Sequence, residues 1–538
     1  MKKTEPKKEK TKKEIPGMRN FQSDGDAFLR SITSIRGKIS DISRRIEIIR
    51  NDFSAVSGIS SRFDAYEERV SEEYLKYSGQ LHELDAFLGG VLGLLGSEND
   101  RHVLVLFQNA AEVRPGGGFV GSYADVVIRK GQLQSIDVRD VYDPDGQLDL
   151  KVVPPHEIKT MSTDWGARDA NWFFDFPTSA RAILYFLENS KMYSEKEVVF
   201  DAVVGLNINV LESILSVIGP VPMEEYGVVI SEDNFLKEIQ REVETGDDKR
   251  AGEPKRILKV LAPIILERLG GLSESQSRIL MERVSEHFSG KDVMIYAKDQ
   301  NVSNFIASVG AGGEVYQLPN SFWGSYVAAV NANIAGGKSD VFVKQTIEAR
   351  IDVDSGGSVF SDVGISRAHT GDKEKDPWWR ATNKNFIQLY TTPGSTLVSV
   401  KGNDVKNLVS RFDYDAEGYE RYPDLEKIEK TKIYQTAYQT WAMQAFGKTA
   451  FGTWFNVPAG QEKTLSIRYH TPATNDFNVS KGNVFTFIFE KQSGVPTGIK
   501  ATISAPLGYI WEESRSPFYV YEETDAPSRA IVKLTLGK

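Results

Sequence analysis

The chain has 538 residues and is therefore too long for one hydrophobic core, since domains usually run to about 100 to 200 residues. Its net charge of -9 and its pI near 5.5 argue against nucleic acid as a main partner, because that role needs a basic field. The absence of cysteine excludes disulfides, thiol catalysis and Cys-ligated metal sites, and it leaves the cellular compartment open.

The chain begins with the lysine-rich segment M-K-K-T-E-P-K-K-E-K-T-K-K. Its lysines repel one another and it offers nothing apolar to bury, so residues 1–17 are expected to form a disordered tail. Attraction of this tail to an anionic membrane surface is the alternative. No apolar run of the roughly 20 residues that a spanning helix needs follows, so we expect a soluble chain without a signal peptide or membrane anchor.

Residues 18–97 show the apolar periodicity of paired helices. Apolar residues recur in alternating steps of four and three from Phe28 to Phe53 and again from Phe63 to Val91, with small residues and a glycine between the two series. The pattern predicts an antiparallel helical hairpin that acts as a stalk, and dimerisation through the same seam is the competing interpretation. The first seam comprises Phe28, Ile32, Ile35, Ile39, Ile42, Ile46, Ile49 and Phe53.

The remaining chain divides into an α/β part and an all-β part. Residues 98–315 alternate short apolar, strand-like runs with helical patterns, which predicts an α/β domain. Residues 316–538 consist of short β-branched or aromatic runs separated by Pro, Gly, Asn and Asp, which predicts an Ig-like β-sandwich. An initial sheet that extends the preceding domain is a further possibility.

A glycine-rich stretch follows the first strand of the α/β part. Gly116, Gly118 and Gly121 satisfy the spacing G-x-G-x-x-G of dinucleotide-binding proteins. That fingerprint needs a helix at the last glycine, whereas the residues from Tyr123 to Ile128 alternate like a strand, and no Walker Gly-Lys-Ser/Thr follows. The stretch is therefore interpreted as a bend between two strands, either a bulged sheet corner or a ligand cradle.

Arginines and carboxylates surround this bend. Arginine suits bidentate contact with phosphate, and Asp or Glu suits Mg²⁺, so the mixture predicts a phosphate–magnesium site. Intramolecular ion pairs are the alternative, which composition alone favours. The predicted phosphate-binding residues are Arg114, Arg139, Arg168, Gly117 and Gly118, and the predicted metal ligands are Glu112, Asp125 and Asp175.

Four segments resemble a bacterial family of uncharacterised proteins known as domain of unknown function 4012. They are L-F-Q-N-A-A-E-V-R-P-G-G-G-F-V-G-S-Y at 106–123, D-V-Y-D-P-D-G-Q-L at 140–148, R-D-A-N-W-F-F-D-F-P-T-S-A at 168–180 and A-A-V-N-A-N-I-A-G-G-K-S-D at 328–340. The resemblance covers most of the chain from about residue 98. It implies an extracytoplasmic position at the cell surface behind a membrane anchor, whereas this chain has only the lysine-rich flank, so a cytoplasmic location is the alternative.

The α/β part is also similar, more loosely, to LytR-CpsA-Psr proteins, through residues 199–222 and S-I-D-V-R-D at 135–140. That family transfers glycopolymers from polyprenyl-pyrophosphate carriers to the cell wall, with arginines and aspartates around a pyrophosphate and Mg²⁺. The similarity implies a matching Arg-Asp motif at Arg139 and Asp140, an equivalent first-strand arginine at Arg114, and Asp140 or Asp169 as the catalytic group that activates an acceptor hydroxyl. The first-strand motif Gly-Ser-Asp-x-Arg is replaced here by Q-N-A-A-E-V-R, which is consistent with binding without catalysis.

The sequence therefore predicts a cell-envelope protein whose α/β domain binds a pyrophosphate-linked glycan or lipid carrier with Mg²⁺. In the enzyme hypothesis, it also transfers a glycopolymer to the cell wall. The alternative is a non-catalytic surface scaffold or adhesion protein, in which the stalk carries a β-sandwich that binds a partner.

Overall fold

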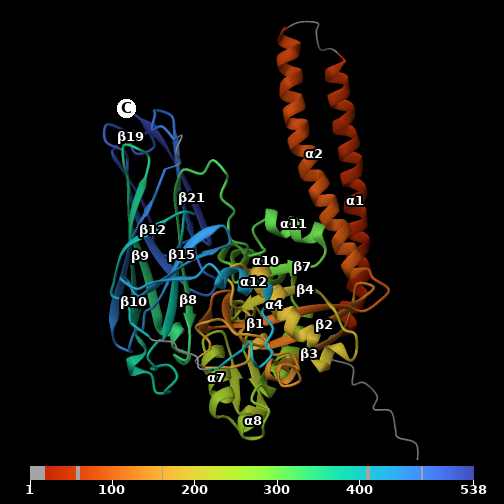
Figure 1. Cartoon of the computed structure of the whole chain (residues 1–538). Coiled ribbons are helices and arrows are strands. Elements are labelled where there is room, and N and C mark those ends of the chain that lie inside the picture. The colour runs from red at the N-terminus through yellow and green to blue at the C-terminus, as the bar shows by residue number, and fades with distance from the viewer. Residues whose placement is uncertain (1–17, 56–60, 160, 407–411, 474–476) are drawn as a thin grey trace, which may run out of the picture.

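The computed structural model describes residues 18–55, 61–159, 161–406, 412–473 and 477–538. A helical stalk, a central α/β region and a pair of C-terminal sheets follow one another along the chain (Figure 1), which confirms the predicted fold class. The predicted tail at 1–17 lies outside the described residues. Of the helices in the described ranges, none combines the length and the apolar character that crossing a bilayer requires.

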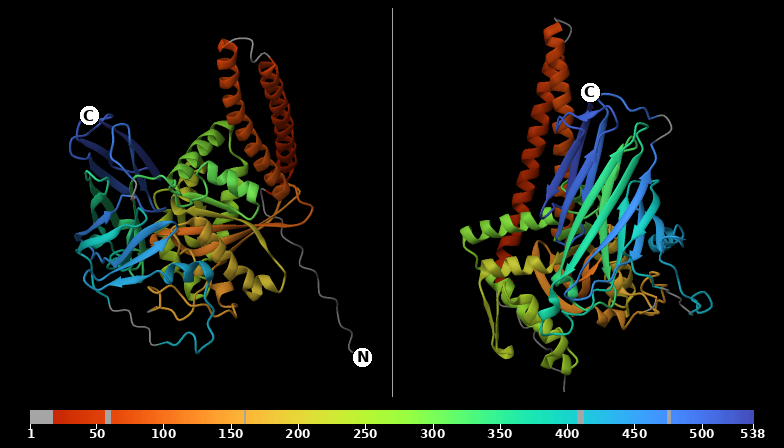
Figure 2. Two further views of the ribbon diagram at one scale, coloured as in Figure 1. Left: turned by 45° about the horizontal axis from the view of Figure 1, so that its top comes forward. Right: turned by 90° about the vertical axis from the view of Figure 1, so that its left-hand side faces the viewer.

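The stalk is an antiparallel hairpin of α1 (Met18–Ser54) and α2 (Ser61–Leu95), as predicted, and it projects away from the rest of the molecule (Figure 2). The Arg36 Nε donates to Asp85 Oδ1 at 2.8 Å across the two helices. The line along which α1 meets α2 differs from the predicted seam, because it includes polar residues and omits five of the eight apolar ones. Its buried or half-buried positions are Leu29, Ile32, Arg36, Ile39, Ser43 and Ile46.

The central sheet has the strand order β3-β2-β1-β4-β7. β1 pairs antiparallel with β2 and parallel with β4, and β7 lies antiparallel to β4 at the edge. The strands are β1 (Arg101–Arg114), β2 (Gly117–Arg129), β3 (Gln132–Asp140), β4 (Phe200–Asn207) and β7 (Val293–Ala297). The helices and the small hairpin around them are α3 (Tyr142–Asp145), α4 (Phe176–Asn189), α5 (Lys191–Ser194), α6 (Ile208–Ile218), β5 (Val221–Met223), β6 (Val228–Ile230), α7 (Phe235–Thr245), α8 (Asp247–Arg250), α9 (Arg256–Gly270), α10 (Glu274–Gly290) and α11 (Gln300–Ser308).

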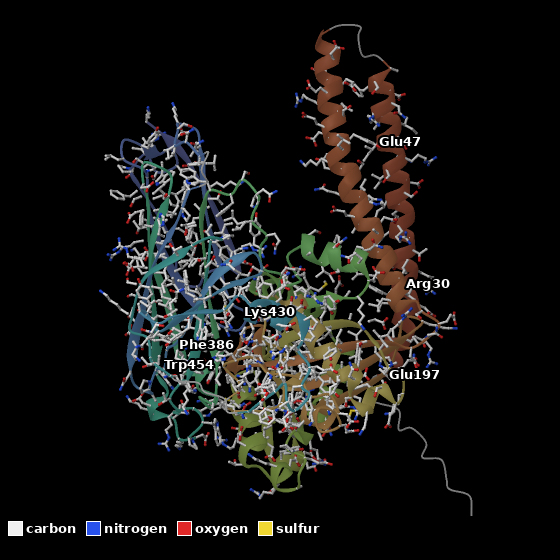
Figure 3. The ribbon with its side chains drawn as sticks, viewed as in Figure 1. Arg30, Glu47, Glu197, Phe386, Lys430 and Trp454 are labelled. Carbon is white, nitrogen blue, oxygen red and sulfur yellow. The ribbon has the colours of Figure 1, made fainter. Side chains whose placement is uncertain are left out.

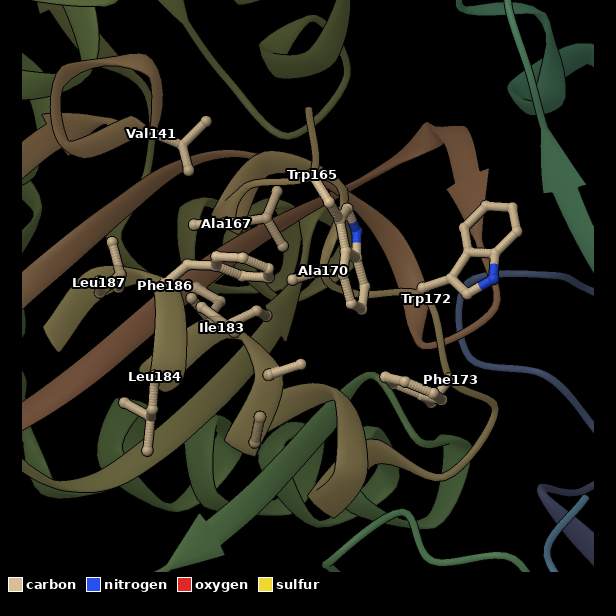
Figure 4. Close-up of a cluster of buried hydrophobic side chains, with 14 of the residues drawn as sticks. Val141, Trp165, Ala167, Ala170, Trp172, Phe173, Ile183, Leu184, Phe186 and Leu187 are labelled. Carbon is tan, nitrogen blue, oxygen red and sulfur yellow. The ribbon is translucent and has the colours of Figure 1, made fainter. Parts of the chain in front are cut away.

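One face of this sheet carries an aromatic core (Figure 4), in which Trp165, Phe173 and Phe186 pack around α4. Helix α4 begins here because the Asp175 side chain accepts a hydrogen bond from the Thr178 backbone N–H at 3.1 Å, and because a proline occupies the first turn. The opposite face is covered by α6, α7 and α9, whose apolar sides form a second cluster. The two faces are therefore closed by different elements.

The C-terminal region contains two sheets that pack face to face. In the described residues, their strand orders are β12-β16-β10-β9-β18-β20 and β13-β14-β15-β11-β8-β17-β21-β19. The middle of the second sheet is buried on both faces, because it also packs against the α/β core through Phe386 and Trp454 (Figure 3). Every residue of β8, β11 and β15 is consequently buried. The elements are β8 (Gly324–Asn333), β9 (Val343–Val353), β10 (Val359–His369), β11 (Asn385–Thr391), β12 (Thr396–Lys401), α12 (Pro423–Glu429), β13 (Ile433–Gln435), β14 (Thr440–Ala445), β15 (Lys448–Trp454), β16 (Glu462–Thr471), β17 (Val484–Glu490), β18 (Thr497–Ser504), β19 (Ile510–Trp511), β20 (Phe518–Glu523) and β21 (Arg529–Gly537).

Candidate functional site

A cavity of about 150 Å³ lies between the central sheet and helices α6, α7 and α9. Its walls are mostly apolar, with Phe107 and Leu206 from the sheet and Leu211, Ile239 and Leu258 from the helices. Such a cavity, with a few polar groups at one place, is the usual form of a site for a small organic ligand. Its polar lining residues are Gln108, Asn109, Ser122, Gln240, Glu244, Lys255 and Lys338.

Charged side chains gather where Lys255 and Lys338 border this cavity, and we call this group the charged rim. It is formed by four cations and four carboxylates, so its formal charges balance. Each of the four segments that carry the resemblance contributes at least one member. The charged rim consists of Glu112, Arg114, Asp140, Asp145, Arg168, Asp169, Lys255 and Lys338.

Arg114 and Arg168 meet at one carboxylate, that of Asp169. The Arg114 Nη2 lies 3.3 Å from Asp169 Oδ1, and the Arg168 Nε lies 3.4 Å from Asp169 Oδ2. Arg114 also donates to Glu112 Oε1 at 2.8 Å and to the Asn333 carbonyl at 2.6 Å, and its side chain is only 3 % exposed. The two guanidinium groups therefore come together as predicted, but around the protein's own carboxylate.

Lys338 reaches the charged rim from a tight turn after β8. Ala335 and Gly337 adopt φ values of 61° and 66°, in the left-handed region, and the buried Asp340 fixes the turn by accepting the Val113 backbone N–H at 3.1 Å. The Lys338 ammonium forms an ion pair with Glu112. Burial alone would raise the pKa of Glu112, but Arg114 and Lys338 lower the pKa below its ordinary value, so this carboxylate stays ionised.

Lys255 precedes the first residue of α9 and donates to the Gly121 carbonyl and, at 2.9 Å, to Asp140 Oδ1. Burial lowers the pKa of Lys255, and the nearby Asp140 opposes this shift. The ammonium lies 5.6 Å from the ring centroid of Tyr142, and the guanidinium of Arg168 lies at the same distance from that ring. Tyr142 is 54 % exposed, so an accessible aromatic ring lies beside the charged rim.

Three predicted site residues lie elsewhere. Arg139 pairs with Asp137 and lies near Met192 on the face of α4, because successive residues of β3 point to opposite faces. Asp125 binds His102, with 2.8 Å between Oδ1 and Nδ1, and Asp175 caps α4. The structure therefore brings together Glu112, Arg114, Asp140, Arg168 and Asp169 but separates them from Arg139, Asp125 and Asp175.

The glycine bend, which joins β1 to β2 through Gly116, Gly117 and Gly118, packs tightly against neighbouring segments of the chain. A Cβ on Gly118 would lie 2.5 Å from the Asn109 carbonyl carbon, and one on Gly117, whose φ is 129°, would lie 2.5 Å from Gln108 Oε1. The Asn171 side chain donates to the Gly118 carbonyl at 2.8 Å. Protein atoms thus fill the space beside both glycines, and these positions serve the close approach of neighbouring segments.

The predicted metal ligands do not fit one Mg²⁺ site. Glu112 belongs to the charged rim, whereas Asp125 and Asp175 lie in separate hydrogen-bonded positions on other elements. Across the described ranges, no group of three His, Asp or Glu side chains is arranged to hold a metal ion. No step through Mg²⁺ follows from this arrangement.

Sequence reasoning missed Lys255, Lys338, Tyr142 and the cavity beside them. Lys338 and Tyr142 stand inside two of the quoted segments, so the segments themselves were the available signal. Lys255 lies in no such segment and is more than 100 residues from Asp140, so only the fold brings these two side chains together.

Comparison with known proteins gives one family. Residues 98–243 match the model of a family described as "Protein of unknown function (DUF4012)", which supports the resemblance predicted from the sequence over that stretch. The finer similarity to LytR-CpsA-Psr proteins stays a prediction. Among curated proteins, none matches the chain.

Two solved structures show distant likeness. One is a "putative nutrient binding protein" of Legionella pneumophila, with 12 % identity and a TM-score of 0.22 over 40 % of this chain and 71 % of that one. The other is an M1 zinc metallopeptidase of Deinococcus radiodurans, with 10 % identity and a TM-score of 0.20 over 36 % of this chain and 42 % of that one. At TM-scores this low, neither likeness bears on the function of this chain.

Proposed function

We propose that the central α/β region binds a phosphorylated lipid carrier, with the phosphate at the charged rim and the adjoining hydrocarbon in the apolar cavity. The observation that carries this proposal is the position of Lys255 and Lys338, which border both the charged rim and the cavity. A cavity of about 150 Å³ is the size that admits a benzene-like group. It therefore suits roughly one five-carbon isoprenoid unit next to the phosphate.

The charge balance of the rim favours binding through its lysines. Arg114 is held by two carboxylates and a carbonyl and is almost fully buried, so its guanidinium has little freedom to turn to a ligand. Lys255 and Lys338 are 12 % and 15 % exposed, and each pairs with one carboxylate that an incoming phosphate can replace. Tyr142 adds an exposed ring on which a sugar of a phosphorylated glycan can lie.

Binding without transfer is the form of the function that these contacts support. An acceptor hydroxyl needs a carboxylate within hydrogen-bond reach, but both oxygens of Asp169 are paired with arginines and Asp140 Oδ1 is paired with Lys255. The family resemblance supports placement of the protein in the cell envelope. In this proposal, the chain presents or holds a lipid-linked glycan there.

The test compares farnesyl phosphate with farnesol in calorimetric binding to the full chain. The phosphate should bind more tightly, and Lys338→Gln or Lys255→Gln should weaken its binding about tenfold or more, because a hydrogen bond to a charged group contributes about 1.5 to 3 kcal/mol. The matched control is Lys259→Gln, since Lys259 is exposed one turn further along α9 and does not line the cavity.

A second variant tests the cavity separately. Ala262 of α9 lines the cavity, so Ala262→Trp should fill part of it and weaken the binding of both ligands. Equal affinities of farnesol and farnesyl phosphate would show that the charged rim does not bind the phosphate. Unchanged binding of both ligands by Ala262→Trp would show that the cavity does not hold the hydrocarbon.

A further inference from the structure

One side of the stalk is apolar but is not covered by the hairpin itself. Three residues of the predicted seam on α1 face α2, namely Ile32, Ile39 and Ile46, of which Ile32 and Ile39 are only 4 % and 6 % exposed. Four of the other seam residues point to a flank of the hairpin and are 45 to 52 % exposed. These exposed residues are Phe28, Ile35, Ile42 and Ile49, which we call the heptad stripe.

The heptad stripe has the spacing that a partner helix requires. Its members recur every seven residues, so they form a continuous line on α1 that follows the left-handed path of a packed neighbouring helix. Tyr66 and Tyr77 of α2 are 58 % and 48 % exposed. At 100° per residue, the two tyrosines reach the same flank of the antiparallel hairpin as the heptad stripe. Both helices therefore present apolar side chains on one side of the stalk.

We propose that this side binds a second copy of the chain, so that two stalks form a four-helix bundle. The heptad stripe spans about 32 Å at 1.5 Å per residue, and two helices side by side are about 20 Å wide. The whole face that carries these side chains thus measures about 600 Å² on each copy, so two paired faces reach the roughly 1,200 Å² of total buried surface at which stable dimers begin.

The charges beside the apolar side match a second copy of the same hairpin. Lys38 and Arg45 are exposed next to the heptad stripe on α1, and Glu73 and Arg69 are exposed next to Tyr77 and Tyr66 on α2. A two-fold axis between two hairpins places α1 of one copy against α2 of the other, so Glu73 of each copy faces the basic edge of its partner. The stalk also stands clear of the C-terminal sheets (Figure 1), which leaves room for another hairpin along its upper part.

Sedimentation velocity on the full chain tests the dimer. The unaltered protein should be dimeric at low micromolar concentration, and the double variant Ile35→Glu, Ile42→Glu should be monomeric at concentrations at least 100-fold higher. The matched control is Thr33→Glu, Ser40→Glu, because each position lies two residues away and about 200° around the helix, where both side chains are exposed. This control should stay dimeric.

Cross-linking gives an independent readout that does not depend on disrupting the stalk. The chain has no cysteine, so a single introduced cysteine can form a disulfide only between copies. Because α1 of one copy lies against α2 of the other, a mixture of chains that carry Tyr77→Cys with chains that carry a cysteine at position 35, 42 or 49 should link rapidly under mild oxidation for at least one of the three positions, whereas a mixture of Tyr77→Cys with Ser40→Cys should not. An unaltered chain that is monomeric at 100 µM, or equal losses of dimer in the two double variants with native circular dichroism, would overturn the proposal.

Discussion

The buried carboxylate of Glu490 connects the α/β region to the C-terminal sheets. The side chain of Glu490 is fully buried, and its Oε1 accepts from Lys291 at 3.1 Å and from Arg529 at 2.7 Å. The Tyr326 hydroxyl and the Tyr316 backbone N–H donate to the other oxygen. Burial alone would raise the pKa of Glu490, but Lys291 and Arg529 lower the pKa to about 2.

Glu490 should therefore make the fold sensitive to acid. Because its pKa falls from an ordinary value of 4.5 to about 2 on folding, its contribution is complete above pH 4.5 and is lost as the pH falls towards 2. This loss corresponds to roughly 3 kcal/mol of the free energy of unfolding. Urea unfolding at pH values from 6 to 2 should show this loss as a steep fall in the free energy of unfolding below pH 4.5, which we call the acid limb.

The variant Glu490→Gln should be less stable at neutral pH by about 3 to 5 kcal/mol, because it leaves the buried Lys291 and the half-buried Arg529 without their carboxylate. Its stability should also vary less with pH below 4.5. Glu348→Gln, on the exposed side of β9, is the control and should keep the acid limb. An equally steep limb in Glu490→Gln would show that other carboxylates cause it.

The sequence predicted part of the candidate site because residues that are close in sequence are also close in the fold. Glu112 and Arg114 lie on one strand, and Arg168 and Asp169 are adjacent, so each pair stays together in almost any fold. Adjacent residues of a strand face opposite ways, however, and Arg139 and Asp140 were predicted at one site although they point to different faces. The position of Lys255 at the site depends on how α9 packs against the sheet, and no local sequence pattern predicts that packing.

At the scale of elements, the glycine bend should tolerate added volume poorly. A Cβ at Gly118 would lie 2.5 Å from backbone atoms of Asn109, which cannot turn aside as a side chain can. We expect Gly118→Ala to lower the free energy of unfolding by about 1 to 3 kcal/mol in urea titrations. Gly37→Ala is the control, because Gly37 lies within α1 with nothing within 4 Å of its added Cβ.

Gly37→Ala should leave stability unchanged or raise it by about 0.5 to 1 kcal/mol, since alanine loses less conformational entropy in a helix than glycine does. Equal stability of Gly118→Ala and the unaltered chain would show that β1 and β2 move apart easily at the bend. In that case, close packing would not explain why glycines occupy these positions.

Periodicity predicted the helices and the main strands, but it did not identify their neighbours. On α1, a seam with steps of four and three contains two equally apolar lines, and the sequence does not show which line faces α2. The structure pairs the line of Ile32 and Ile39 and exposes the line of Ile35 and Ile42. The interhelical hydrogen bond from Arg36 to Asp85 lies on the line that faces α2, and the apolar period does not predict this polar contact.

At the scale of the whole molecule, the α/β region and the C-terminal sheets share a core. Phe174 lies 5.3 Å from the Tyr390 ring, and Trp165 lies 5.6 Å from that of Tyr422, between ring centroids. The boundary predicted at 315 and 316 therefore runs through packed aromatic contacts. A strand's composition does not say which element covers it, so the sequence did not predict this shared core.

A fragment of residues 98–315 should accordingly fail to fold stably, whereas residues 98–538 should unfold in one cooperative transition. The shorter fragment exposes Trp165, Phe173 and Phe174, and losing the burial of three such side chains costs roughly 5 to 9 kcal/mol. It also leaves Lys291 buried without Glu490. Because a domain has only about 5 to 15 kcal/mol of net stability, these losses are comparable with the whole. Circular dichroism melting curves and the dispersion of NMR signals of both fragments would measure this difference. If the fragment of residues 98–315 gave well-dispersed signals and melted cooperatively, the shared aromatic contacts would join two cores that are each stable alone.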